Sequence, residues 1–236
     1  MLTLYYYPST ASMVPHILLE ELAVPYQRVL VDRTVDAHKS PAYLQLNPNG
    51  LIPVLTNTNN DGGEVSEVAI YETAAIALHL CDTHPQALLA PPVGTLQRAH
   101  FYQWLMWLTN TLQATLIIYF YPERWVGNVD DTGGVGDASA ASIVKAHAER
   151  KVGVLLDQLD AELARHSSDV VSTPWFGGYG YSALDAYIFT LCRWTRNFAS
   201  PPARMRPHLG PYLQRVLVRP AVQRVMVSEG LAAPWI

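Results

Sequence analysis

The chain has 236 residues, of which 50% are hydrophobic and 15% are charged, and its formal net charge is −4. This composition is typical of a globular protein with one or two domains, and it lacks the concentrated basic face of nucleic-acid binders. Because no apolar stretch approaches about 20 residues and no early segment looks like a leader, we expect a cytoplasmic protein that binds small molecules and neither nucleic acid nor membranes.

Strand and helix patterns alternate at the start of the chain. Leu2 to Tyr7 is rich in residues that favour strands, Met13 to Leu22 repeats apolar residues at helical spacing, and Tyr26 to Val31 alternates again. This order predicts a βαβ unit, in which the first two strands are parallel.

A second set of patterns completes the N-terminal unit. A short helix is predicted around Pro41 to Leu46, followed by a strand over Pro53 to Thr56 and another near Val65 to Ala69. The turn-rich residues 57–63 between these strands predict an antiparallel hairpin. A helix follows over Thr73 to Cys81, which gives the order βαβ-α-ββα.

A change of composition marks a domain boundary. Residues 84–94 contain three prolines and end in glycine, as linkers do. Strand patterns are then replaced by long helical ones over Leu96 to Tyr119 and Ile143 to Leu163. We therefore predict an α+β protein with two domains, residues 1–83 and an all-helical domain over residues 95–236.

Three further features lie in the helical part. Residues 122–140 predict a long loop that is either a lid or simply mobile. The segment Ser182-Ala-Leu-Asp185 has the pattern of a capping box that opens a buried helix. A last helix over Tyr212 to Leu231 is interrupted near Arg219-Pro220, because proline breaks a helix interior.

The two cysteines give little support for redox or metal chemistry. Cys81 and Cys192 lie far apart, each inside an apolar helical pattern. Buried thiols are therefore favoured over a disulfide, a Cys-x-x-Cys pair or a metal cluster. No metal or redox cofactor is expected.

Three motifs follow one another along the chain: Asn47-Pro48-x-Gly50-x-Ile52-Pro53-Val54-Leu55, Tyr71-Glu72-Thr73-x-Ala75-Ile76 and Ser182-x-x-Asp185. In this order and at these separations they resemble the motifs of the cytosolic glutathione transferases, with phi-like, theta-like and beta-like features. The resemblance covers the whole chain. It implies a thioredoxin-like N-terminal domain, an all-helical C-terminal domain, glutathione as a substrate and a two-fold homodimer.

The same resemblance implies which residues hold glutathione. Pro53 follows a cis peptide bond in this family, which leaves the backbone of Ile52 free to pair with the cysteinyl part of the tripeptide. Thr73 opens a helix whose free N–H groups suit the γ-glutamyl carboxylate, and Glu72 would face the γ-glutamyl ammonium. The alternative for Glu72 and Thr73 is an ordinary helix cap.

A histidine and a lysine extend this expected site. His38-Lys39-Ser-Pro41 is similar to the His-Lys-x-Pro segment of phi and related bacterial enzymes, where the two side chains reach the glycyl carboxylate. The alternative is a solvated surface pair. Leu51 stands where many members have glutamine or lysine, so polar help from that side chain is absent.

The segment between the first strand and the first helix is expected to activate the thiol. Ser9 aligns with the catalytic serine of zeta and theta-like members, and it ranks before Ser12 and Tyr6, while Thr10 lies in the same segment. Ala11 stands where beta-class enzymes have cysteine, so mixed-disulfide chemistry lacks its nucleophile. The serines can instead cap the helix, and the tyrosine can pack in the sheet.

A hydrophobic electrophile is expected between the first helix and the helix after the linker. Met13, Trp107 and Tyr119 are its predicted walls, although aromatic residues at helical spacing are usually core. The leading hypothesis is a glutathione transferase that conjugates the thiolate to this electrophile. A protein that binds glutathione without turnover and a glutathione-dependent isomerase are the alternatives.

Overall fold

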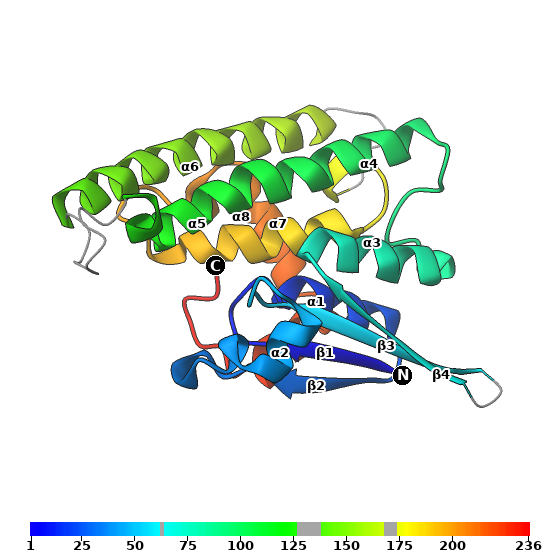
Figure 1. The fold of residues 1–236 in the computed structure, drawn as a ribbon. Helices are drawn as coiled ribbons and strands as arrows, with labels where there is room; N and C mark the ends of the chain where they lie inside the picture. Colours follow the sequence, from blue (N-terminus) through cyan, green and yellow to red (C-terminus); the bar gives the residue numbers. More distant parts are fainter. Residues whose placement is uncertain (62–63, 127–137, 168–173) are drawn as a thin grey trace.

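A four-stranded sheet with its helices lies on one side of the protein, and a layer of long helices lies on the other (Figure 1). The computed structural model describes residues 1–61, 64–126, 138–167 and 174–236. The sheet with its helices is thioredoxin-like, and the remainder of the described chain is helical. The fold class predicted from the sequence is therefore confirmed.

The sheet has the strand order β2-β1-β3-β4, and its strands are β1 Leu2–Tyr6, β2 Tyr26–Leu30, β3 Val54–Asp61 and β4 Glu64–Tyr71. β1 is parallel to β2 and antiparallel to β3, and β3 and β4 form the expected hairpin. The hairpin is longer than predicted, since its pairing continues from Thr56 to Asp61. Cross-strand hydrogen bonding there prevails over the turn preference of the Asn-rich sequence.

Three helices accompany the sheet: α1 Met13–Leu22, α2 Pro41–Leu46 and α3 Thr73–Thr83. Ser40 caps α2, since its side chain accepts a hydrogen bond from the N–H of Tyr43. α1 contacts α3 as well as α7 and α9 of the helical part, and its residues Met13 to Leu19 are all buried. α1 therefore joins the sheet to the helical layer.

The helical layer contains α4 Leu96–Trp107, α5 Ala114–Phe120, α6 Ala138–Ser167, α7 Ala183–Trp194, α8 Leu209–Leu217 and α9 Pro220–Ser228. A π-helical stretch over Leu108–Gln113 separates α4 from α5. Pro220 begins α9, so the interruption predicted there is confirmed. Within the loop predicted over residues 122–140, Pro122–Trp125 forms a 3₁₀ helix and residues 127–137 lie outside the described residues.

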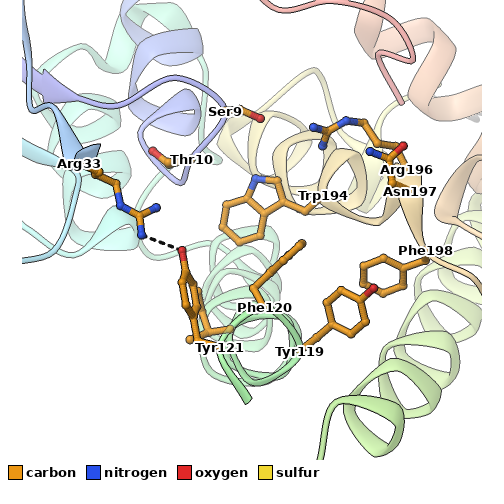
Figure 2. Close-up of a pocket in the computed structure, with 11 residues that line it drawn as sticks. Ser9, Thr10, Arg33, Tyr119, Phe120, Tyr121, Trp194, Arg196, Asn197 and Phe198 are labelled. Carbon is orange, nitrogen blue, oxygen red and sulfur yellow. Dashed lines mark hydrogen bonds between the residues drawn. The ribbon is translucent and has the colours of Figure 1, made fainter. Parts of the chain in front are cut away.

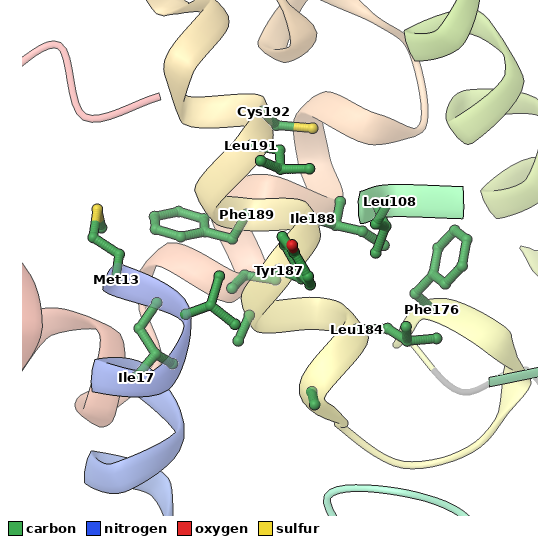
Figure 3. Close-up of a cluster of buried hydrophobic side chains, with 14 of the residues drawn as sticks. Met13, Ile17, Leu108, Phe176, Leu184, Tyr187, Ile188, Phe189, Leu191 and Cys192 are labelled. Carbon is green, nitrogen blue, oxygen red and sulfur yellow. The ribbon is translucent and has the colours of Figure 1, made fainter. Parts of the chain in front are cut away.

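Helix α7 lies at the centre of the core (Figure 3). All of its residues from Ala183 to Arg193 are buried, and it contacts both α1 and α4. Cys81 and Cys192 are free, buried thiols, as predicted, and burial raises the pKa of Cys81 to about 12. A thiol with so high a pKa stays protonated at neutral pH, so it is a poor nucleophile.

The capping box at the start of α7 is present and fully buried. The carboxylate of Asp185 accepts hydrogen bonds from the N–H of Phe176 at 3.0 Å, the N–H of Ser182 at 2.8 Å and the hydroxyl of Tyr212 at 2.8 Å. The Ser182 hydroxyl is a fourth donor, at 3.1 Å. Burial raises the pKa of Asp185 to about 6, while these hydrogen bonds lower it. The carboxylate thus ties the start of α7 to α8.

Replacing Asp185 with Asn should destabilise the fold by about 2 kcal/mol, because an amide nitrogen cannot accept from the donors of Ser182. Ser182→Ala should cost about 1 kcal/mol, as expected for loss of a helix cap. Denaturant unfolding of the two variants and the parent protein measures both values. Equal midpoints for Asp185→Asn and the parent would contradict this role.

Candidate functional site

Two adjacent cavities lie where the N-terminal domain meets the helical layer. The first, here called the cleft, has a volume of about 500 Å³. Its lining comes from the loop before α1, the segments on either side of α2, the region around α5 and the end of α7, and it includes Thr10, His38, Lys39, Ile52, Gln113 and Trp194. The second, here called the aromatic cavity, has a volume of about 250 Å³ and lies beside Tyr119, Phe120, Trp194 and Phe198 (Figure 2). Thr10 and Trp194 line both cavities, so the two spaces share a wall.

Asn47 shapes one wall of the cleft. Its side-chain amide donates to the carbonyl of Leu51 at 2.8 Å, and its side-chain oxygen accepts from the N–H of Asn49 at 3.0 Å. The Tyr43 hydroxyl donates to the same Leu51 carbonyl, also at 2.8 Å. These bonds explain why the motif begins with asparagine, because one short side chain closes the turn from both sides.

The turn also explains the glycine of the motif. Gly50 has a φ of +61°, and a Cβ atom there would lie 3.1 Å from the carbonyl oxygen of His38. Glycine therefore meets both a conformational and a spatial requirement. The Ile52–Pro53 peptide bond is cis, as predicted, and Ile52 lines the cleft, while Pro53 is buried.

The lining of the cleft is cationic. His38 and Lys39 both line it, as do Arg33 and Arg124, and no carboxylate belongs to its described lining. Lys39 Nζ lies 3.1 Å from a carboxylate oxygen of Asp36, in an exposed pair. His38 is largely buried, and its Nδ1 has no hydrogen-bond partner in the described part of the chain. The cleft therefore suits a ligand with carboxylate groups.

Glu72 and Thr73 lie close to this wall in the fold but are not part of the cleft lining. The β3–β4 register pairs Val54 with Tyr71, which places Pro53 and Glu72 at the same end of the hairpin. Glu72 is exposed and has a φ of 70°, and the buried Thr73 follows as the first residue of α3. The start of α3 thus presents its N–H groups near the end of the motif.

Ser12 closes the loop that precedes α1. Its side chain is fully buried, its hydroxyl donates to the Tyr7 carbonyl at 2.9 Å, and it accepts from the Tyr7 N–H at 3.3 Å. The Thr10 hydroxyl also donates to that carbonyl, at 2.7 Å, and lies 3.0 Å from Ser12 Oγ. The hydroxyls of Ser12 and Thr10 thus both donate to the loop at the Tyr7 carbonyl, and Thr10 in addition lines both cavities.

Ser9 lines the aromatic cavity and is held by two residues from the helical part. Its N–H donates to Glu229 Oε2 at 2.9 Å, and its Oγ lies 2.6 Å from Arg193 Nη1. Glu229 Oε1 lies 2.7 Å from His16 Nδ1, so the carboxylate joins the loop to α1 as well. Ser9 has a φ of 62°, an unusual conformation for a residue with a side chain, and these contacts stabilise it.

The Arg193 guanidinium is a buried cation behind Ser9. Arg193 is only 2% exposed, and it forms no ion pair within the described ranges. Burial, together with the neighbouring charge of Arg196, lowers the pKa of Arg193 to about 10. Because a guanidinium has donors only, Ser9 Oγ accepts this bond and keeps its own proton for another acceptor.

Three of the predicted site residues lie elsewhere. Met13 is fully buried in the core beside α7 (Figure 3), and the half-buried Trp107 packs with its ring 5.1 Å from that of Trp104. Tyr6 shares a strand face with the core, with the guanidinium of Arg28 5.0 Å from the centre of its ring. None of the three lines the cleft or the aromatic cavity, because each packs in or against the core.

Tyr119 does line the aromatic cavity, where its ring centre lies 4.1 Å from that of Phe198 (Figure 2). Arg33 lines both cavities, and its Nη2 donates to the Tyr121 hydroxyl at 2.9 Å. The indole N–H of Trp194 is buried and has no partner among the residues described. Sequence reasoning missed Arg33 and Trp194.

One signal could have directed attention to the end of α7. A capping box predicts where α7 begins, and Arg193 follows the apolar run of that helix. A charged residue in a buried helix is uncommon and usually serves a partner or a ligand. The partner, Ser9, is 184 residues away in the sequence, so no local pattern identifies it.

The described residues bring together no group of three or more histidine, cysteine, aspartate or glutamate side chains that could hold a metal ion. Among the same residues, no helix is both long and apolar enough to cross a membrane.

Comparisons with known proteins agree with this geometry. Residues 8–83 match the family described as "Glutathione S-transferase, N-terminal domain". "Glutathione S-transferase GST-4.5" of Xanthomonas campestris is 27% identical over 230 residues, which cover 97% of this chain and 98% of that protein.

Solved structures extend the match to the whole fold. A glutathione transferase homolog from Sulfitobacter, with bound glutathione, has a TM-score of 0.79 at 25% identity, covering 98% of this chain and 99% of that one. The beta-class enzyme of Sphingomonas chungbukensis has a TM-score of 0.74 at 29% identity, covering 98% and 100%. Fold, motifs and relatives agree across nearly the full length: residues 8–83 match the N-terminal domain of the glutathione S-transferase family, and the whole chain is similar to glutathione S-transferases in sequence and fold.

Proposed function

We propose that the protein is a glutathione transferase that binds glutathione in the cleft and joins its sulfur to a hydrophobic electrophile in the aromatic cavity. The observation that carries this proposal is the shared wall: Thr10 and Trp194 line both spaces. A thiol held there would face the electrophile directly, and such positioning is a large part of catalysis of bimolecular reactions. In this proposal residues 1–83 bind glutathione, residues 84–94 link the domains and residues 95–236 supply the acceptor site.

Charge supports glutathione as the ligand of the cleft. The tripeptide has two carboxylates and one ammonium group, and the cleft lining is cationic. His38 and Lys39 would hold the glycyl carboxylate, and the backbone of Ile52 would pair with the cysteinyl residue. The N–H groups at the start of α3, together with Thr73, would hold the γ-glutamyl carboxylate, with Glu72 on the ammonium. The Sulfitobacter relative binds glutathione in a similar fold.

Ser9 is the proposed donor to the thiolate. Lowering the pKa of a thiol from about 8.5 to about 6.5 requires roughly 2.7 kcal/mol of preferential stabilisation of the anion. The Ser9 hydroxyl accepts from the Arg193 guanidinium, and this bond strengthens the hydroxyl as a donor. The buried positive charge behind it favours an anion at the sulfur. Thr10 is the alternative donor, because it lies on the shared wall.

A two-fold homodimer is proposed for the assembly. Several apolar residues near the start of α4 and in the linker are exposed, including Leu88 at 70%, Val93 at 75% and Leu96 at 88%. Exposed apolar residues of this kind are available to an association surface.

Removing the Thr73 hydroxyl should weaken glutathione binding about tenfold or more, because a hydrogen bond to a charged group contributes about 1.5–3 kcal/mol. Thr73→Val removes the hydroxyl at constant volume, and Thr73→Ser keeps it as the matched control. Calorimetric titration with glutathione measures both dissociation constants. If the parent protein gives no heat and no thermal shift at millimolar glutathione, the proposed function is wrong.

Removing the Ser9 hydroxyl should raise the pKa of the bound thiol by about one unit and lower kcat/KM for a reactive aryl halide by about tenfold, since one unit corresponds to about 1.4 kcal/mol. Ultraviolet titration of bound thiolate and conjugation rates measure the two effects in Ser9→Ala. Ser12→Ala is the control, and it should act on stability more than on the thiol pKa.

The same assays separate the alternatives. Negligible conjugation by the parent, Ser9→Ala and Ser12→Ala proteins, with glutathione binding intact, would favour a binding protein without turnover. An unchanged thiol pKa in Ser9→Ala and a raised one in Thr10→Val would move the catalytic role to Thr10.

A further inference from the structure

Aromatic side chains line much of the aromatic cavity. Tyr119 and Phe198 lie with their ring centres 4.1 Å apart and their planes inclined by 32°. Phe120 stands nearly perpendicular to Trp194, at 85° and 6.2 Å. Figure 2 shows Tyr119, Phe120 and Phe198 on the side of the cavity opposite Ser9, with Trp194 between them and the Ser9 loop. Walls of this kind favour an aromatic ligand.

The opposite end of the cavity is positively charged. Arg196 lines it and is half-buried, and its Nη1 donates to the carbonyl of Arg193 at 3.0 Å. Arg193 lies behind Ser9, as described above, and burial lowers the pKa of both arginines. Two neighbouring cations in partly buried positions repel each other, and that repulsion is costly without a counter-ion.

The described structure supplies no counter-ion for Arg196. The lining of the aromatic cavity contains no aspartate or glutamate within the described ranges. Glu229, which lies near Arg193, already bonds His16 and the N–H of Ser9. Glu149, near Tyr119, accepts from the N–H of Ser200 at 2.7 Å. Neither carboxylate forms an ion pair with Arg196 in these ranges.

A second donor in the same cavity, the indole N–H of Trp194, has no hydrogen-bond partner among the described residues. The indole N–H of Trp194 is buried, and the ring lies between the Ser9 loop and the aromatic walls (Figure 2). Buried donors are nearly always satisfied in native proteins, so an unpaired one beside a cavity indicates a missing acceptor. The Arg196 guanidinium and the Trp194 indole N–H therefore both favour a ligand with oxygen acceptors in this cavity.

We propose that the acceptor of this enzyme is an aromatic electrophile that carries a carboxylate, and that Arg196 is the residue that selects it. The inference rests on the proposed function, because it names the substrate class of the same site. A guanidinium matches the two oxygens of a carboxylate in a fork of paired hydrogen bonds, and a partly buried site strengthens such a pair. Arg33 is less specific, because it lines the cleft as well and would act on glutathione too.

The reaction used to test this is aromatic substitution. The glutathione thiolate forms a C–S bond with the ring carbon that bears chlorine, the C–Cl bond breaks, and chloride leaves with its electron pair. The thiol proton passes to solvent, and no oxidant or reductant takes part. A chloronitrobenzoate and the matching chloronitrobenzamide have the same leaving group and similar size but differ in charge.

The parent protein should prefer the benzoate over the benzamide by about tenfold or more in kcat/KM. Each kcat/KM is first divided by the rate constant for the reaction of the same compound with glutathione without protein. Arg196→Gln should remove this preference and change the benzamide rate less than about twofold. Arg196→Lys should retain part of it. Arg215→Gln removes an exposed arginine of α8 that lines neither cavity, and it should behave as the parent.

If turnover is too slow to measure, the binding of chemically prepared conjugates tests the same preference. Calorimetry on the S-aryl glutathione with a carboxylate and on its amide counterpart should show the same preference in the parent, and its loss in Arg196→Gln. Equal affinities in the parent, or a preference that survives Arg196→Gln, would overturn the inference alone. Failure of glutathione and both conjugates to bind would overturn the proposed function, and the inference with it.

Discussion

The functional site depends on the hydrogen bonds that the helical part makes to Ser9. Arg193 of α7 donates to its hydroxyl, and Glu229, just after α9, accepts from its N–H. These two groups hold a residue with a positive φ at the wall of the aromatic cavity. Neither domain alone contains this arrangement. The contact between α1 and helices α7 and α9 is therefore part of the site as well as part of the core.

This dependence explains why α7 is so firmly fixed. Its first turn is tied to α8 through Asp185, and its middle is buried among apolar side chains (Figure 3). Its last turn carries Arg193 and Trp194 to the site. A buried arginine without an ion pair in the described chain is costly for folding. We propose that the buried charge is retained because it favours a thiolate next to Ser9. Helix α7 therefore contributes both to the stability of the core and to the proposed site.

The sequence predicts the fold well because its signals are local. The capping box at Ser182, the helix start at Pro41 and the break at Pro220 each depend on neighbouring residues, and the structure has all three. The turn at Asn47 is equally local. Prediction was poorer for the hairpin, where strand pairing extends β3 beyond Thr56, and for Met13, whose helix faces α7 rather than a cavity. Both depend on long-range packing.

The residues of the site also divide into those that local motifs predict and those that depend on long-range packing. His38, Lys39 and Ile52 line the cleft, as the motif predicts, whereas Arg193 and Arg196 are joined to Ser9 and its cavity only by the tertiary fold. A crystal structure with glutathione tests the central claim most directly. We expect the sulfur within about 3.5 Å of Ser9 Oγ, at the wall shared by the two cavities. A sulfur bonded by another donor and out of reach of Ser9 Oγ would contradict the account.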